Sequence, residues 1–399
     1  MAKPTQPGVT STEAVHAGVP RRRAHGSLAP AVEQTSTFTF GSTAEIERSL
    51  RGEDPDPDRQ EHSRHGNPTV REVERRMAAL EGAEDALLFA SGMAAITTAL
   101  MAITKAGDHV VLFRDCYRRT RHFVSATLGR FGVSHSLVPE GDLRALAEVI
   151  GPRTRAVVVE TPTNPFLACV DLEALVAACR PLGRPRILVD ATFASPYNWR
   201  PIRSGADLVV HSASKYLAGH SDVLGGVVSG SSSLLGLIRD LRGVLGGVCD
   251  PHAAFLIGRG LKTLALRMEK QNTSALAIAR ALELHPKVDR VFYPMLPSHP
   301  SHGAAQRQLR GGGGVVSFVV KGGRGAAARL VDRCKLAYIA PSLGGVETLI
   351  EQPAVMSYAE LDDEQLAVVG IPPGLIRLAV GIEEPADILA DLRAALDGP

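Results

Sequence analysis

The chain has 399 residues, which exceeds the usual size of one hydrophobic core, so a large domain with a smaller companion is expected. Lysine and arginine total 44 against 42 aspartate and glutamate, which leaves a net charge of +2 and argues against a nucleic-acid partner. No run approaches the roughly 20 apolar residues of a membrane span, and no signal peptide is recognisable. The five cysteines are an odd number without a CxxC pair, which argues against a disulfide framework and a zinc site. We therefore expect a cytoplasmic protein that does not contact the membrane.

The first segment of the chain, residues 1–64, is broken by proline, glycine and charge, most strongly at 51–61. Such a segment cannot pack a core by itself, so we expect an arm that contacts a neighbouring subunit. Two HxxH pairs, at 62–65 and 299–302, stand in loop-like contexts without a third ligand. We expect surface or interface histidines there and no metal site.

An apolar stretch in residues 87–103 passes through Ser91 and Gly92 directly into an alanine-rich helical pattern. Free backbone N–H groups at a helix start form an anion site, so Gly92 and Met93 are candidates to bind a phosphate. Taken alone, the string fits an ordinary tight turn better than a phosphate site.

Short β-branched runs at 110–113, 156–160, 187–190 and 208–211 alternate with helical stretches such as 171–179, for which Asp171 is a plausible N-cap. This alternation predicts an α/β fold, with a mostly parallel sheet covered by helices on both faces, in a large domain over residues 65–261. Beyond it, a long helical stretch at 262–284 and a more antiparallel pattern from 311 predict a smaller α+β domain over residues 262–399.

Two of the predicted strands deliver chemically opposite groups at their C-terminal ends, where ligands bind in open α/β sheets. Asp190 ends one of them, and Lys215 follows the other within HSASKYLAGHSD. An amine that binds an aldehyde and a carboxylate that pairs a pyridinium nitrogen are what a pyridoxal phosphate enzyme requires. Either residue alone also fits a helix cap or a solvated lysine. Together with the candidate phosphate segment, and with the Ser212 and Ser214 hydroxyls beside Lys215, they favour the cofactor.

Motifs of competing enzyme classes are absent: GxGxxG after a strand, GxxxxGK[ST], HExxH and GxSxG. Other strings, in their order along the chain, are SGMAA, DCYRRTRHF, ETPTNPFLACVD, DATFASP, HSASKYLAGHSD, APSLGGVETL, EQPAVMSY and LIRLAVGIE. From about Glu61 onwards the chain thereby resembles the Cys/Met metabolism enzymes of pyridoxal phosphate fold type I, especially the plant-like cystathionine γ-synthases.

The resemblance implies roles for individual residues. Lys215 binds the cofactor covalently and then moves protons, and Asp190 keeps the cofactor's ring nitrogen protonated. Tyr117 stacks on the ring and also has a catalytic role, in assisting transaldimination. Arg377 is implied to bind the substrate's α-carboxylate through its planar, two-pronged guanidinium. Asn164 and Ser342 are implied to lie beside that carboxylate.

The resemblance also implies an oligomer, at least a dimer with shared sites and usually a tetramer, because Arg64 reaches the phosphate of a neighbouring subunit. His62 stands where the family generally has a tyrosine; it can still bind a phosphate, but any role of a phenol there is put in doubt. Arg118 and Arg119 follow Tyr117 as in plant-like γ-synthases and unlike methionine γ-lyases. They either receive an anionic leaving group or face solvent, and the sequence favours neither.

The leading hypothesis is a pyridoxal phosphate-dependent exchange or elimination at Cγ of an L-amino acid with a γ-leaving group, such as the joining of an activated homoserine to cysteine to give cystathionine. A first alternative is a specialised γ-lyase or γ-replacing enzyme acting on an unusual amino acid, for example a γ-halogenated one. Cystathionine or methionine γ-lyase activity and a non-catalytic relative of the same fold are further alternatives.

Overall fold

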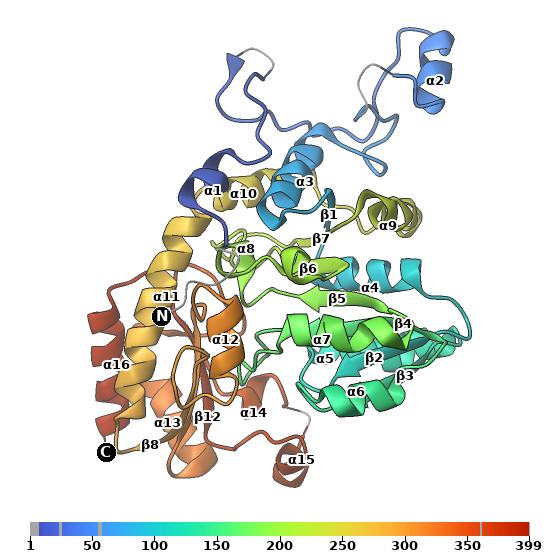
Figure 1. Cartoon of the computed structure of the whole chain (residues 1–399). Helices are drawn as coiled ribbons and strands as arrows, with labels where there is room; N and C mark the ends of the chain where they lie inside the picture. The colour runs from blue at the N-terminus through green and yellow to red at the C-terminus, as the bar shows by residue number, and fades with distance from the viewer. Residues whose placement is uncertain (1–7, 24–25, 55–57, 360, 399) are drawn as a thin grey trace.

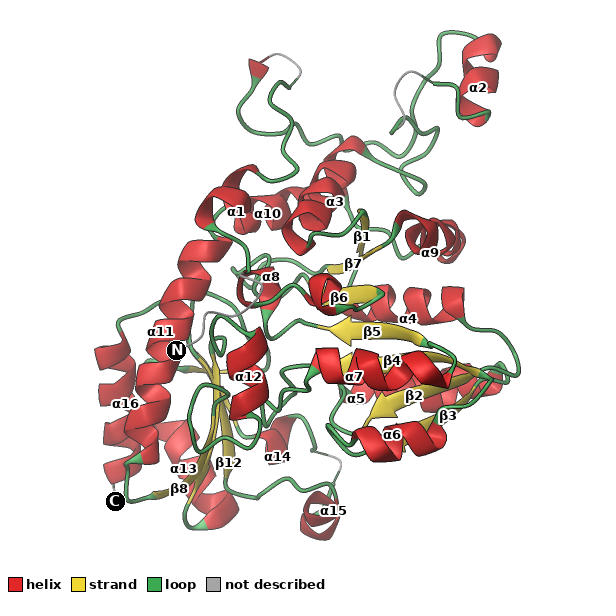
Figure 2. Ribbon diagram, in the orientation of Figure 1, coloured by secondary structure: helices red, strands yellow, loops and turns green. Residues whose placement is uncertain are grey.

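The computed structural model describes residues 8–23, 26–54, 58–359 and 361–398. Within these residues the strands form two sheets, a seven-stranded one in the order β1-β7-β6-β5-β4-β2-β3 and a five-stranded one in the order β10-β11-β12-β9-β8 (Figure 1). Helices surround both sheets (Figure 2). The predicted α/β fold class is confirmed.

The large sheet is parallel from β3 to β6, and β1 and β7 join it in antiparallel pairs at one edge. Its central strands are nearly continuous runs of valine and leucine with no exposed surface, which is typical of strands covered on both faces. Each predicted strand is confirmed to within two residues at its start. The strands are β1 (Asp85–Phe89), β2 (His109–Phe113), β3 (Ser134–Val138), β4 (Thr154–Glu160), β5 (Arg186–Asp190), β6 (Leu208–Ser212) and β7 (Gly226–Gly230).

Helices follow the strands of the large sheet, and among them α3 packs against β1 and β7 while α4 packs against β6 and β7. The predicted helix at 171–179 is confirmed as α7, and the Asp171 carboxylate caps it by accepting a hydrogen bond from the Ala174 N–H at 3.1 Å. The helices of this part are α3 (Pro68–Glu81), α4 (Gly92–Ile103), α5 (Arg118–His122), α6 (Leu143–Val149), α7 (Leu172–Cys179), α8 (Ser195–Asn198), α9 (Ser232–Leu245) and α10 (Pro251–Leu261).

The smaller sheet is antiparallel except for its β10-β11 pair. Helices α11 and α13 pack against it, and α16 packs against these two helices. The predicted long helix at 262–284 is α11, and the four glycines at 311–314 form a loop before β9. The elements are α11 (Leu264–Glu283), β8 (Val288–Phe292), α12 (His302–Gln308), β9 (Val315–Val320), α13 (Gly323–Arg333), β10 (Tyr338–Ile339), β11 (Leu349–Glu351), α14 (Pro353–Met356), α15 (Asp363–Val368), β12 (Leu375–Ala379) and α16 (Pro385–Asp397). The domain boundaries stay predictions.

The N-terminal segment divides into two parts. Around α1 (Ser11–His16) it lies on the chain's own body, where the Val9 N–H donates to the Pro196 carbonyl at 3.0 Å and Arg76 donates to the Ala14 carbonyl at 2.8 Å. The later part, with α2 (Thr43–Leu50), extends away from the body (Figure 1). Among the described helices, none is both long and apolar enough to cross a bilayer.

Candidate active site

A cavity of about 340 Å³ opens where β4, β5 and β6 end and α4 begins, a size within the roughly 300–1,000 Å³ of small-molecule sites. Most of the residues predicted from the sequence line it. Its walls are formed by Ser91, Gly92, Met93, Ile96, Tyr117, Glu160, Asn164, Asp190, Thr192, Phe193, Ser212, Ser214, Lys215, Leu224, Pro341, Ser342, Leu343, Ser357 and Arg377.

One end of the cavity is rich in hydrogen-bond donors. Ser91 caps α4 by accepting a hydrogen bond from the Ala94 N–H at 3.0 Å, and the N–H groups of Gly92 and Met93 precede the first helical bond. A Cβ atom at Gly226 would lie 2.1 Å from the Ser91 carbonyl oxygen, so a glycine is required there. Close packing of β7 on this turn therefore fixes a helix N-terminus that suits a phosphate.

Asp190 lines the same cavity, at the last position of β5. Its Oδ1 accepts two hydrogen bonds from Thr192, from the N–H at 3.0 Å and from Oγ1 at 2.6 Å. Burial raises the pKa of Asp190 above its ordinary value, and the two Thr192 bonds oppose that rise. A carboxyl in these surroundings is suited to share a proton with a buried basic nitrogen.

Lys215 is largely buried, and its Nζ donates a hydrogen bond to the Ser342 Oγ at 2.6 Å. Burial lowers the pKa of Lys215, the positive charge of Arg377 lowers it further, and Glu351 partly offsets both. More of the lysine is therefore in the neutral, nucleophilic form than at the protein surface.

Arg377, on β12, is buried and held from three sides. It donates to the Asn164 Oδ1 at 2.9 Å and to the Ser342 carbonyl at 3.0 Å, and its Nη2 lies 2.7 Å from Glu351 Oε1. Among the described residues its Nε has no hydrogen-bond partner, so the guanidinium keeps a donor for a further carboxylate. Ser342 has a φ of 104°, an unfavourable backbone for a serine that lets it face Lys215 and Arg377 together.

Glu160 is a site residue that the sequence reasoning missed. It ends β4 beside Asp190 in the sheet register, is 4% exposed, and accepts a hydrogen bond from the Tyr117 N–H at 2.5 Å. Burial first, and then the nearby Asp190, raise the pKa of Glu160 far above its ordinary value. The signal was available, because Glu160 ends its strand just as Asp190 does. Glu351, by contrast, meets Arg377 only through the register of β11 with β12, for which the sequence gives no signal.

His62 and Arg64 do not line the cavity, and both are exposed. Arg118 and Arg119 do not line it either. Among the described residues no group of three or more histidine, cysteine or acidic side chains could hold a metal ion. The expectation that His299 lies at the surface is wrong, because it is 4% exposed and its Nε2 lies 2.9 Å from the Phe166 carbonyl.

The cavity fits pyridoxal phosphate on its own geometry. A donor-rich helix N-terminus suits the phosphate, a buried carboxyl suits the ring nitrogen, and a lysine with a lowered pKa suits the aldehyde. Arg377, whose Nε has no hydrogen-bond partner among the described residues, lines the same cavity and suits the carboxylate of an amino acid.

Comparison with known proteins agrees with this geometry. A family model described as "Cys/Met metabolism PLP-dependent enzyme" matches residues 11–397. The chain is 43% identical over 389 residues to cystathionine gamma-synthase 1, chloroplastic, of Nicotiana tabacum, covering 96% of this chain and 71% of that protein. It is 41% identical to L-methionine gamma-lyase of Fusobacterium nucleatum, covering 97% of both. The crystal structure of metB from Corynebacterium glutamicum superposes with a TM-score of 0.90 at 36% identity, over 98% of both chains.

Proposed function

We propose a reaction for this chain, which belongs to the Cys/Met metabolism family of pyridoxal phosphate-dependent enzymes. The reaction is replacement of a γ-substituent: an L-homoserine activated by an O-acyl or O-phospho group loses that group, and the cysteine thiol takes its place to give cystathionine. The observation that carries the proposal is the buried lysine between Ser342 and Arg377, in a cavity that also holds Asp190. The 43% identity to a cystathionine gamma-synthase supports this choice of reaction.

One set of cavity residues would hold the cofactor. The amides of Gly92 and Met93, with the hydroxyls of Ser212 and Ser214, would bind the cofactor's phosphate. Asp190 would hold a proton at the ring nitrogen, and Tyr117 would cover the ring. When bound, pyridoxal phosphate supplies an electron-withdrawing ring that makes the protons on the substrate's Cα and Cβ removable.

Substrate binding and proton transfer fall to the other side of the cavity. The Arg377 guanidinium would hold the α-carboxylate in two-pronged geometry, with Asn164 and Ser342 fixing its plane. Lys215 would then take the proton from Cα, give it up to the bound cofactor, and take a second proton from Cβ, which allows the group at Cγ to leave with its bonding electrons. Its lowered pKa favours the neutral amine, which is the form that can accept a proton.

The active unit is proposed to be at least a dimer. His62 and Arg64 are exposed and lie outside the chain's own cavity. Leu224 lines the cavity and is 72% exposed, so its side chain is accessible to the arm of a second copy. We expect the arm of a second copy to bring Arg64 to the phosphate. Light scattering that finds only monomers at micromolar concentration would exclude this arrangement.

Steady-state assays test the reaction. Purified protein with pyridoxal phosphate is incubated with cysteine and O-acetyl-, O-succinyl- or O-phosphohomoserine, and products are identified by mass. We expect cystathionine from at least one donor, with Lys215→Ala abolishing turnover while the far-ultraviolet circular dichroism is retained. Negligible turnover with all three donors would rule the assignment out.

A second candidate function is γ-elimination, favoured by the 41% identity to a methionine gamma-lyase. The same residues serve it, because the chemistry diverges only after the γ-group has left. Formation of a 2-oxo acid and ammonia from methionine, or from the homoserine esters without cysteine, at rates above those of cystathionine formation would favour elimination.

A further inference from the structure

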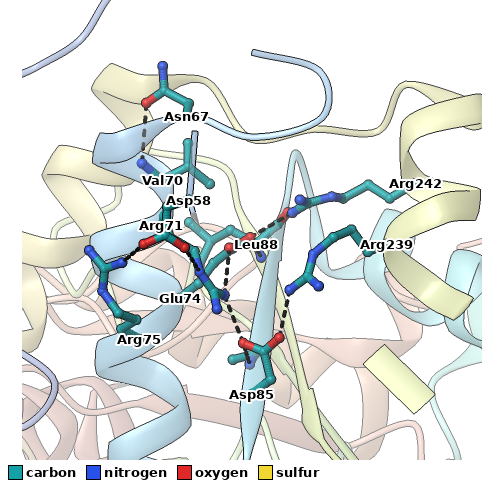
Figure 3. A network of polar contacts seen from close by, with 11 residues as sticks. Asp58, Asn67, Val70, Arg71, Glu74, Arg75, Asp85, Leu88, Arg239 and Arg242 are labelled. Carbon is teal, nitrogen blue, oxygen red and sulfur yellow. Dashed lines mark hydrogen bonds and ion pairs between the residues drawn. The ribbon is translucent and has the colours of Figure 1, made fainter. Parts of the chain in front are cut away.

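An ion-pair network lies where the arm meets the body (Figure 3). Asp58, the first described residue after 55–57, contacts two arginines of α3: its Oδ1 lies 3.0 Å from the Arg71 Nε, and its Oδ2 pairs with the Arg75 guanidinium. Arg71 extends the network to Asp85 at 2.7 Å, at the start of β1. Burial by itself would lower the pKa of Arg71, but the neighbouring carboxylates have the larger effect and raise this pKa, so Arg71 stays positively charged.

The other half of the network is buried deeper. Glu74 accepts a hydrogen bond from the Leu88 N–H at 2.9 Å and pairs with Arg242 at 2.7 Å, and the side chains of this pair are no more than 4% exposed. Arg242, on α9, also donates to the Leu88 carbonyl at 2.6 Å. These contacts join α3, α9 and β1 into one base, on which Asp58 is held.

The loop between Asp58 and Asn67 carries His62 and Arg64, which are exposed and do not line the chain's own cavity. The Arg64 guanidinium donates to the carbonyl of Gly243 at 2.5 Å, one residue beyond Arg242 on α9. The Arg64 N–H donates to the His62 Nδ1 at 3.1 Å. The bond to Gly243 uses one of the five donors of a guanidinium, and the others can bind an anion.

We propose that Asp58 and Arg71 are positioning residues for Arg64, and that through this ion pair the arm of one subunit presents its arginine to the cofactor phosphate of the other. This inference rests on the proposed function. Arg64 is six positions after Asp58, a span of at most roughly 22 Å when extended, so a tether at Asp58 confines the loop. Confinement before binding removes part of the ordering cost that a free loop would add to each binding event.

The first test measures cofactor affinity, as the dissociation constant of pyridoxal phosphate from visible absorption. Arg64→Ala is expected to weaken affinity roughly tenfold to a hundredfold, because it removes hydrogen bonds to a charged group. Asp58→Asn is expected to weaken it roughly fivefold, the upper range for a partly exposed ion pair. Glu47→Gln is the matched control, since it breaks an ion pair with Arg51 on the same arm, outside the network; it should change nothing.

A second test identifies the subunit whose active site is impaired by Asp58→Asn, because a purely structural role for Asp58 would impair the site of its own chain. Differently tagged Asp58→Asn and Lys215→Ala chains are co-expressed, and the hybrid is purified. Its single Lys215 site lies in the Asp58→Asn chain but receives the normal arm of the other. Wild-type cofactor affinity and kcat/KM per Lys215 site are expected. In the reciprocal hybrid, wild type with an Asp58→Asn, Lys215→Ala double variant, the wild-type chain's site should be impaired.

The two hybrids separate the possible failures. The positioning inference is overturned if Asp58→Asn impairs the site that contains the Lys215 of its own chain, or if Asp58→Asn has no effect. If Arg64→Ala is rescued in the same hybrid design while Asp58→Asn shows no defect, the shared site stands and only the tether is lost. If Arg64→Ala itself is not rescued by the partner, the shared site of the proposed function fails.

Discussion

The proposed two-pronged contact of Arg377 with the substrate's carboxylate gives the most direct test of how the substrate is held. Arg377→Lys keeps the positive charge and loses the planar fork, so a lysine at this position can meet one carboxylate oxygen where the arginine meets two. It also loses the directed bonds to Asn164 at 2.9 Å and to the Ser342 carbonyl at 3.0 Å, which orient the guanidinium. The ion pair with Glu351 can be kept by the ammonium.

The expected loss follows from one charge-assisted hydrogen bond. Such bonds contribute about 1.5–3 kcal/mol, which corresponds to roughly a tenfold to hundredfold fall in kcat/KM. Cofactor affinity should change little, because Arg377 is proposed to bind the substrate's carboxylate and not the cofactor. The control is Arg290→Lys on β8 of the same sheet, an exposed arginine that stacks over Phe292 at 4.7 Å; its kcat/KM should match the wild type.

The assay compares an amino acid with the corresponding amine that lacks the carboxylate. Binding of each to the holoenzyme is followed by the change in visible absorption, and kcat/KM is measured for the amino acid. Arg377→Lys should weaken binding of the amino acid and leave binding of the amine unchanged. An unchanged kcat/KM, or an equal loss for both compounds, would remove Arg377 from the carboxylate site.

Three further predictions concern buried ionisable groups. Burial lowers the pKa of Lys215 from 10.5, so the charged lysine destabilises the folded apoprotein below the lowered pKa, and this destabilisation is absent above 10.5. Lys215→Met should therefore raise the free energy of unfolding in urea more at about pH 7 than at about pH 11. Equal gains at the two pH values would contradict this. Burial raises the pKa of Glu160, which favours its neutral carboxyl. Glu160→Gln, which imitates that neutral form, should therefore bind the cofactor within about twofold of wild type, and Glu160→Ala roughly tenfold more weakly. Equally poor binding by both variants would contradict a neutral Glu160. Burial, and then Asp115, raise the pKa of Glu140 from 4.5 to about 9, so the wild type loses stability as the pH rises between these values. The Glu140→Gln variant should be more stable than the wild type by roughly 3 kcal/mol at pH 7. This difference should disappear near pH 4.

Much of the site could be predicted from the sequence because its residues follow strands. Asp190 and Lys215 stand at or just beyond the ends of β5 and β6, and Gly92 opens the helix after β1, so one rule of parallel sheets brings them together. The same rule would have found Glu160. Arg377, Asn164 and Ser342 came from resemblance to a family, and the structure brings all three into the cavity.

What the sequence could not predict depends on long-range register and docking. Glu351 meets Arg377 across two antiparallel strands 26 positions apart in sequence, and Asp58 meets Arg71 only because the arm folds back on α3. Local patterns carry no information about either pairing. His299 illustrates the same limit, because a polar loop motif gives no sign that Phe166 will cover it.

The charges around Lys215 suggest that Arg377 has a second effect, separable from its geometry. Its positive charge lowers the pKa of Lys215, so Arg377→Met should raise that pKa, whereas Arg377→Lys should leave it nearly unchanged. Only a neutral amine attacks an aldehyde. In the apoprotein, the rate of cofactor attachment against pH should therefore shift to higher pH in Arg377→Met and stay in place in Arg377→Lys, even though both lose kcat/KM. A common shift in both variants would mean that packing, and not charge, sets the reactivity of Lys215.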